Sequence, residues 1–170
     1  MAALELIQQL APHQLARMER DCPRIVIGDA GAAAAIFEPD SALVVLDFHT
    51  IRDHGDEPIT LALLLVHEAT HARLTKCGID YQSQRDRVER LCRRAERSFA
   101  DRLPEKDRAH YRAYYESQEV DPPDYSPEAD IARNVAALRE LGVRDWMIRP
   151  LEAFARWRLR RQAARHSSLR

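Results

Sequence analysis

Residues 58–77 decide the fold, and they read PITLALLLVHEATHARLTKC. Pro58 suits the first turn of a helix, and Gly78 is a typical stop residue directly after its end. Between them, most positions up to Val66 are apolar, which indicates a helix that is buried on most sides. We therefore predict a central helix over residues 57–77.

This helix contains an HExxH pattern, HEATH, at residues 67–71. His67 and His71 lie one helical turn apart, so both imidazoles project from one face and can bind one Zn²⁺. Glu68 is offset around the helix, where it can act as a general base toward a metal-bound water. The alternative is that both histidines pack on or cap the helix and that Glu68 joins a surface ion pair. Zinc is the expected cofactor, although two histidines and a glutamate suit several divalent metals.

A catalytic zinc site needs a third protein ligand. The HExxHxxGxxH pattern is absent, because position 74 is Leu and position 77 is Cys. Glu89 and Glu96 are the candidates, and their spacing of seven residues puts them on one helix face, roughly 10 Å apart along the axis. The short connection after the HExxH helix brings the first two turns of the next helix opposite His71. That geometry favours Glu89, and Glu96 stays open as the alternative.

HEATH followed by a glutamate on the next helix resembles the gluzincin group of zinc metallopeptidases. More closely, the chain resembles small, largely uncharacterised bacterial zincin-like proteins called minigluzincins, over about residues 42–100. The resemblance implies that His67, His71 and Glu89 are the zinc ligands and that Glu68 is the catalytic acid/base. It also implies a small sheet whose edge strand lines the substrate groove and is extended by a bound peptide. Residues 42–48 would be that edge strand.

The chain departs from the pattern of the larger gluzincins at one position. Those proteins carry an Asp four residues after the glutamate ligand, where it orients a metal-binding histidine, and this chain has Arg93 there. The orienting group must therefore come from elsewhere or be absent. The group that stabilises the oxyanion also stays open, and each candidate can equally be a packing or surface residue. These candidates are His110, Tyr111, Tyr114, Tyr115, Tyr125 and Arg133.

The remaining sequence predicts one α+β domain over residues 1–170, with a small, mostly antiparallel sheet of about three strands beside the HExxH helix. Turn residues 38–41 predict a hairpin between two apolar segments. Ser83 and Asp86 resemble a capping box. In chain order we expect an N-terminal helix at 1–22 with a break at Pro12, then strands within 24–48, with the hairpin arms at 33–37 and 42–48, and a loop at 49–57. The HExxH helix at 57–77 is followed by a third-ligand helix at 82–103 and by C-terminal helices within 105–166. Ser126 and Pro127 begin one of these C-terminal helices.

Composition excludes several function classes. The chain has 170 residues with 26 basic and 27 acidic side chains, which argues against a general nucleic-acid binder. Three cysteines without CxxC spacing, and the lack of a long apolar stretch, predict a cytoplasmic protein without a transmembrane segment. The arginine-rich segment 156–165 permits contact with an anionic membrane surface or nucleic acid. We favour a solvated terminal helix that packs Phe154 and Trp157 inward.

The leading hypothesis is a zinc-dependent metallopeptidase or related metallohydrolase that acts on a peptide or protein substrate. The alternative is a non-catalytic zincin-like module that uses zinc structurally or binds a partner peptide at its sheet edge. A fourth protein ligand would favour the module, because structural zinc sites are closed. Cys92, one turn after Glu89, is the candidate for such a ligand or for a regulatory thiol, although a plain buried cysteine is the simpler interpretation.

Overall fold

The computed structural model describes residues 2–31, 33–81, 83–120 and 124–167. Its contacts group the chain into two compact units, Met1–Pro123 and Asp124–Arg170, and each is described by itself. The α+β class with a three-stranded sheet is confirmed. The single domain over residues 1–170 stays a prediction.

The first unit begins with two short helices, α1 (Ala2–Leu10) and α2 (Pro12–Asp21). Ala11 between them has a non-helical backbone and is fully buried. Pro12 takes the first position of α2, where its missing N–H costs no helical hydrogen bond. The predicted break at Pro12 is therefore confirmed.

The sheet contains β1 (Arg24–Gly28), β2 (Ala35–Glu38) and β3 (Leu43–Asp47), in the spatial order β1-β3-β2. The predicted hairpin is confirmed, since β2 and β3 are antiparallel with Ile36 opposite Val45. The prediction of a mostly antiparallel sheet is wrong, because β1 runs parallel to β3. The chain passes from β1 to the far edge as β2 and then returns through the hairpin to fill the middle.

Residues 49–57 were expected to form a loop, and most of them form a helix instead, α3 (Phe48–His54). Asp47 at the end of β3 caps it, because its carboxylate accepts hydrogen bonds from the backbone N–H groups of His49 and Thr50 at 2.8 and 3.3 Å. Ile51 packs against the core. An N-cap and one partly buried apolar side chain thus stabilise a helix in this polar segment.

The central helix is α4 (Pro58–Lys76), as predicted. Cys77 is its C-cap, and Gly78 follows with a φ of +77°, a conformation that glycine adopts without strain. The next helix, α5 (Arg85–Ala100), is shorter than predicted, and residue 82 lies outside the described residues. The expected capping box is wrong, because Gln84 is the N-cap and no side chain caps the helix.

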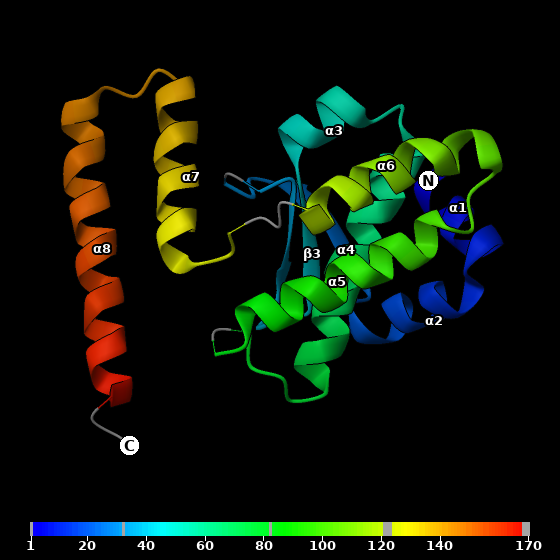
Figure 1. The fold of residues 1–170 in the computed structure, drawn as a ribbon, viewed down its shortest axis with the longest axis horizontal. Coiled ribbons are helices and arrows are strands. Elements are labelled where there is room, and N and C mark those ends of the chain that lie inside the picture. The colour runs from blue at the N-terminus through cyan, green and yellow to red at the C-terminus, as the bar shows by residue number, and fades with distance from the viewer. Residues whose placement is uncertain (1, 32, 82, 121–123, 168–170) are drawn as a thin grey trace. The chain divides into compact units, whose positions relative to one another are not determined.

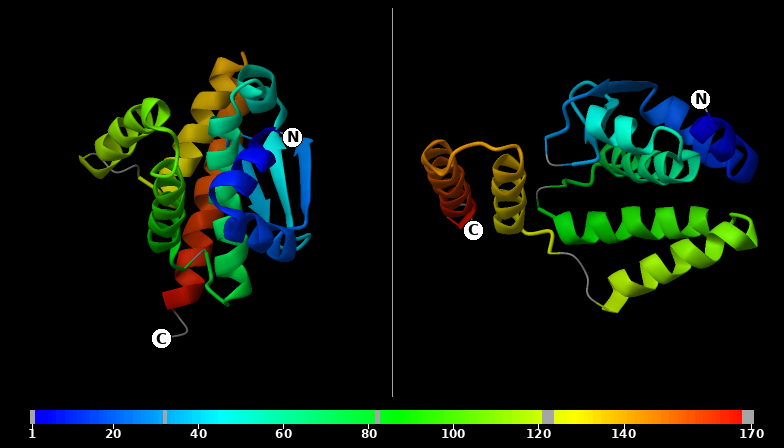
Figure 2. Two further views of the ribbon diagram at one scale, coloured as in Figure 1. Left: turned by 90° about the vertical axis from the view of Figure 1, so that its right-hand side faces the viewer. Right: turned by 90° about the horizontal axis from the view of Figure 1, so that it is seen from above.

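The core of this unit forms around α4, which contacts α1, α2, α5 and strand β2. Figure 2 shows α5 and α6 (Glu105–Val120) on the side of α4 away from the strands. Ile7, Val44 and Phe99 are fully buried members of this core. The α4 helix is thus held on several sides, which keeps the HEATH face in a fixed position.

The second unit is a pair of helices, α7 (Pro127–Glu140) and α8 (Asp145–Ser167), drawn in yellow and orange in Figure 1. Ser126 caps α7 as predicted, because its Oγ accepts a hydrogen bond from Ala129 N–H at 3.1 Å. Inward packing of Phe154 and Trp157 is wrong: their side chains stack on each other and are 60% and 45% exposed. Ile148 of α8 is fully buried instead. Within the part of the chain that the structure describes, no helix is long and apolar enough to cross a membrane.

Candidate metal centre

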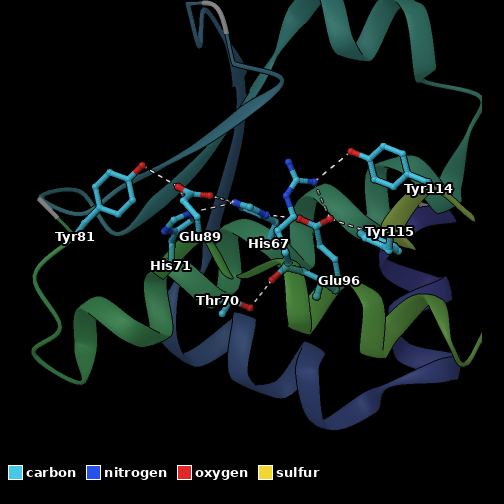
Figure 3. Close-up of polar contacts among 10 residues, drawn as sticks. His67, Thr70, His71, Tyr81, Glu89, Glu96, Tyr114 and Tyr115 are labelled. Atoms are coloured by element: carbon cyan, nitrogen blue, oxygen red, sulfur yellow. Dashed lines mark hydrogen bonds and ion pairs between the residues drawn. The ribbon is translucent and has the colours of Figure 1, made fainter. Parts of the chain in front are cut away.

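His67 and His71 project from one face of α4, as their spacing predicts. Their Nε2 atoms are 3.0 Å apart, and both side chains are nearly buried, with 12% and 13% of their surface exposed. Figure 3 shows the two rings pointing toward the same side chain of α5. That side chain is Glu89.

The Glu89 carboxylate completes a triangle of donor atoms. Its Oε2 lies 3.4 Å from His67 Nε2, and its Oε1 lies 3.6 Å from His71 Nε2. Tetrahedral ligands at zinc distances of about 2.0–2.1 Å would lie about 3.3–3.4 Å from one another. The separations of 3.0, 3.4 and 3.6 Å scatter around that value, so the three groups fit one zinc ion.

Cys92 lies beside this triangle. Ligand atoms of His67, His71 and Cys92 all fall within 4.8 Å of one another, a looser spacing than that of the Glu89 set. Cys92 is fully buried, and burial together with the negative charge of Glu89 raises the pKa of its thiol. Because a thiolate is the ligand form, we regard Glu89 as the better third donor.

The charges of the site suit a bound cation. Burial raises the pKa of Glu89, but His67 and His71 more than offset this effect and lower it to about 2. Burial lowers the pKa of His67, but its contacts with Glu89 and Glu96 raise it to about 10. Burial and the charge of His67 lower the pKa of His71 to about 4. The buried carboxylates thus stabilise positive charge at His67, where metal binding would displace a proton, whereas the low pKa of His71 leaves its imidazole neutral, the form that binds a metal.

Glu68 lies on α4 next to His67 and is 6% exposed. Burial raises the pKa of its carboxyl to about 7, although the charge of His67 and the backbone N–H of Phe37 in β2 lower it. A carboxyl that titrates near neutral pH can both accept and return a proton. Its position beside the donor triangle suits the predicted general base.

Glu96 lies on the opposite side of the His67 ring from the donor triangle. Its Oε1 contacts Nδ1 of His67, whereas Glu89 faces Nε2. The two nitrogens of an imidazole point away from each other, so a metal ion bound at Nε2 is out of reach of Glu96. The geometry favours Glu89 over Glu96, and the ligand set stays a prediction.

Tyr81 belongs to the site and was not predicted. Its hydroxyl donates a hydrogen bond to Glu89 Oε1 at 2.8 Å, and its ring lies edge-on to His71 with the centroids 5.3 Å apart. The residue follows the Gly78 stop by three positions, in the connection between α4 and α5. An aromatic residue in the turn between the two ligand helices is the one signal that could have pointed to it.

The six oxyanion candidates lie in different places. Tyr115 is buried and donates to Glu96 Oε2 at 2.9 Å, and the hydroxyl of Tyr114 accepts from Arg93 at 3.3 Å. Three of the remaining four make the following contacts: Tyr111 with Thr60 Oγ1 at 3.2 Å, His110 edge-on with the Tyr111 ring, and Arg133 with the carbonyl of Asp124 at 2.8 Å. The fourth, Tyr125, belongs to the second unit. Tyr115 therefore contacts Glu96, which in turn contacts His67 of the donor triangle. The role of each candidate in catalysis stays a prediction.

The edge strand beside the site is β2. The expectation that residues 42–48 form this edge is wrong, because β3 pairs with a strand on each side. Asp47 N–H donates to Ala34 O at 3.0 Å, and the alternation of an antiparallel ladder then directs the N–H groups of Ala35 and Phe37 away from β3. Phe37 N–H accordingly faces Glu68.

Comparisons with models of protein families, with curated proteins and with solved structures find no match to this chain. The assignment of the site therefore depends on its own geometry and chemistry.

Proposed function

We propose that the protein is a zinc-dependent metallopeptidase or a related metallohydrolase. The observation that carries the proposal is the donor triangle of His67, His71 and Glu89, with separations that suit one tetrahedral ion. The buried Glu68 beside it supports a hydrolytic role over simple metal storage. The resemblance of HEATH and Glu89 to the gluzincin pattern agrees with this proposal.

Each residue of the site has a definite task in this proposal. His67, His71 and Glu89 would hold the ion, and Tyr81 would keep the Glu89 carboxylate in place through its hydrogen bond. A bound zinc ion supplies Lewis acidity, which polarises a carbonyl and lowers the pKa of water. Glu68 would take the proton of the attacking water and deliver it to the leaving amine.

A peptide is the substrate class that the surroundings favour. Strand β2 is an edge strand next to α4, and backbone groups of Ala35 point away from its partner β3. An extended peptide can add to such an edge and bring its carbonyl toward the site.

We place this activity in the cytoplasm because Cys22, Cys77 and Cys92 are free thiols and form no disulfide. The near-balanced charge argues against a nucleic-acid substrate.

Metal content, measured by elemental mass spectrometry, tests the proposal. We expect about one zinc per wild-type chain, loss of zinc in His71→Ala and Glu89→Ala, and retention in Glu68→Gln. Glu68→Gln should at the same time lose cleavage of a peptide library that the wild type cleaves. A wild-type chain that takes up no metal after zinc is supplied would overturn the proposal.

The second candidate is the non-catalytic zincin-like module. Cys92 favours it, because its sulfur lies in the same cluster as both histidines and could close the coordination shell. Cys92→Ala distinguishes the two functions. Unchanged zinc content in this variant supports an open, catalytic site, and loss of zinc supports a closed, structural one.

A further inference from the structure

Glu96 is a buried carboxylate with both oxygens engaged. It is 5% exposed. Its Oε1 contacts Nδ1 of His67, and its Oε2 accepts hydrogen bonds from the Tyr115 hydroxyl at 2.9 Å and from Arg93 at 3.3 Å. Figure 3 shows Glu96 and Tyr115 on the far side of His67 from Glu89. Three helices, α4, α5 and α6, therefore meet at one carboxylate.

This contact determines which nitrogen of His67 is available. A proton on Nδ1 that is donated to Glu96 leaves Nε2 directed at Glu89 and His71, 3.4 and 3.0 Å away. In proteins, a carboxylate or carbonyl that binds the second nitrogen of a metal-binding histidine fixes its tautomer and ring orientation. Without Glu96, either nitrogen of His67 could face the donor triangle.

We propose that Glu96 is the positioning residue that orients His67 for metal binding, and that Tyr115 and Arg93 hold it there. The inference depends on the proposed function, because it assigns a role at the same site. Arg93 occupies the position where larger gluzincins carry the orienting Asp, and here it binds the carboxylate that lies one turn further along α5. Arginine at 93 and glutamate at 96 thus act as a pair.

Helix geometry explains why a carboxylate at position 96 can reach His67. Residues 89 and 96 are seven apart, so they lie on one face of α5, about 10 Å apart along the axis. The α5 helix returns along α4, so its later residues meet the earlier histidine of the motif. Glu89 consequently reaches both histidines at Nε2, whereas Glu96 reaches only His67.

Zinc affinity, measured by competition with a chelator, tests the inference. We expect Glu96→Ala to bind zinc about 10–100-fold more weakly than the wild type, the usual effect of removing such a partner. Glu96→Gln, which keeps an acceptor oxygen but not the charge, should fall between the two. Asp86→Ala is the matched control, because it removes an exposed acidic side chain from the same helix.

A second measurement separates positioning from a general structural effect. Nitrogen-15 correlation spectra of the histidine rings should show a slowly exchanging proton on His67 Nδ1 in the wild type and in Glu96→Gln. The same proton should exchange rapidly in Glu96→Ala. Tyr115→Phe should retain the proton and lose less zinc affinity than Glu96→Ala, because it removes only one of the groups that hold the carboxylate.

The outcomes distinguish this inference from the proposed function. Wild-type affinity in both Glu96 variants, with the Nδ1 proton unchanged, would overturn the positioning role and leave the metal site intact. Complete loss of zinc in Glu96→Gln, equal to the loss in Glu89→Ala, would make Glu96 a ligand and overturn the inference too. A wild type that binds no zinc would end the proposed function, and the Nδ1 proton in the zinc-free protein would still decide the role of Glu96.

Discussion

Two buried acidic clusters lie along α4, and they differ in what balances their charge. Near its C-terminal end, the fully buried side chain of Asp21 from α2 contacts Arg20 at 2.9 Å, Lys76 at 3.1 Å and Arg73 at 3.9 Å. In the middle of α4, Glu89 and Glu96 face His67 and His71 instead. Both clusters remove carboxylates from water. Arginine and lysine side chains balance the first, whereas the second has one such partner, Arg93 at 3.3 Å from Glu96, and otherwise faces imidazoles.

This difference separates a structural ion cluster from a candidate binding site. Arginine and lysine stay protonated at neutral pH, so Asp21 needs no further partner. Imidazoles can release their protons, so the carboxylates of the second cluster can instead be balanced by a metal ion. The first cluster should therefore contribute to stability without zinc, and the second should add stability mainly when zinc is bound.

The largest expected effect is stabilisation by zinc. At a free zinc concentration of 100 times Kd, the free energy of unfolding should rise by about 2.7 kcal/mol. The midpoint of thermal unfolding should then rise by roughly 5–10 °C in the wild type and in Asp21→Asn. Glu89→Gln should show no such rise, because it lacks the third donor. Differential scanning fluorimetry measures these unfolding midpoints. An equal rise of the midpoint in all three proteins would show that zinc binds elsewhere.

The elements that sequence predicted well are those with local signals. Pro12 marks the break before α2, Pro58 and Gly78 delimit α4, and Ser126 caps α7. In contrast, the polar residues 49–57 predict a loop, whereas α3 forms there with Asp47, the last residue of β3, as its N-cap. The parallel pairing of β1 with β3 also has no local signal, since it depends on which strand fills the middle of the sheet.

The candidate site shows the same division. The HExxH spacing and the position of Glu89 follow from helix periodicity and a short connection, so they could be proposed from sequence. Tyr81 and the position of Glu96 could not, because both depend on how α5 packs on α4. Tyr115 adds a third helix, α6, whose register against α5 no local pattern specifies. Sequence thus indicates the groups that would bind a metal, and packing decides which groups orient them.

The second prediction concerns Asp21. Hydrogen bonds from Arg20 lower the pKa of its carboxyl, and Lys76 lowers it as well, whereas burial raises it. The resulting pKa is about 2. The stability that the ionised group contributes is therefore present above its unfolded pKa of about 4 and is lost as the pH falls through 2. Asp21→Asn should lower the free energy of unfolding by about 2 kcal/mol at pH 7. Urea titrations from pH 7 to pH 2 should show the wild type converging on the variant, and a constant difference would contradict this assignment.

The smallest effects distinguish the cations around Asp21. Lys76 Nζ lies 3.1 Å from the carboxylate and also donates to the carbonyl of Arg20 at 3.3 Å, whereas Arg73 is 3.9 Å away. About half of each cation's side chain is exposed, so solvent weakens both ion pairs. Lys76→Ala should cost about 0.5 kcal/mol and Arg73→Ala less, with both losses shrinking in high salt. A cost above about 2 kcal/mol for Arg73→Ala would mean that the Asp21 cluster depends on a single cation, and its contrast with the histidine cluster would then be one of degree.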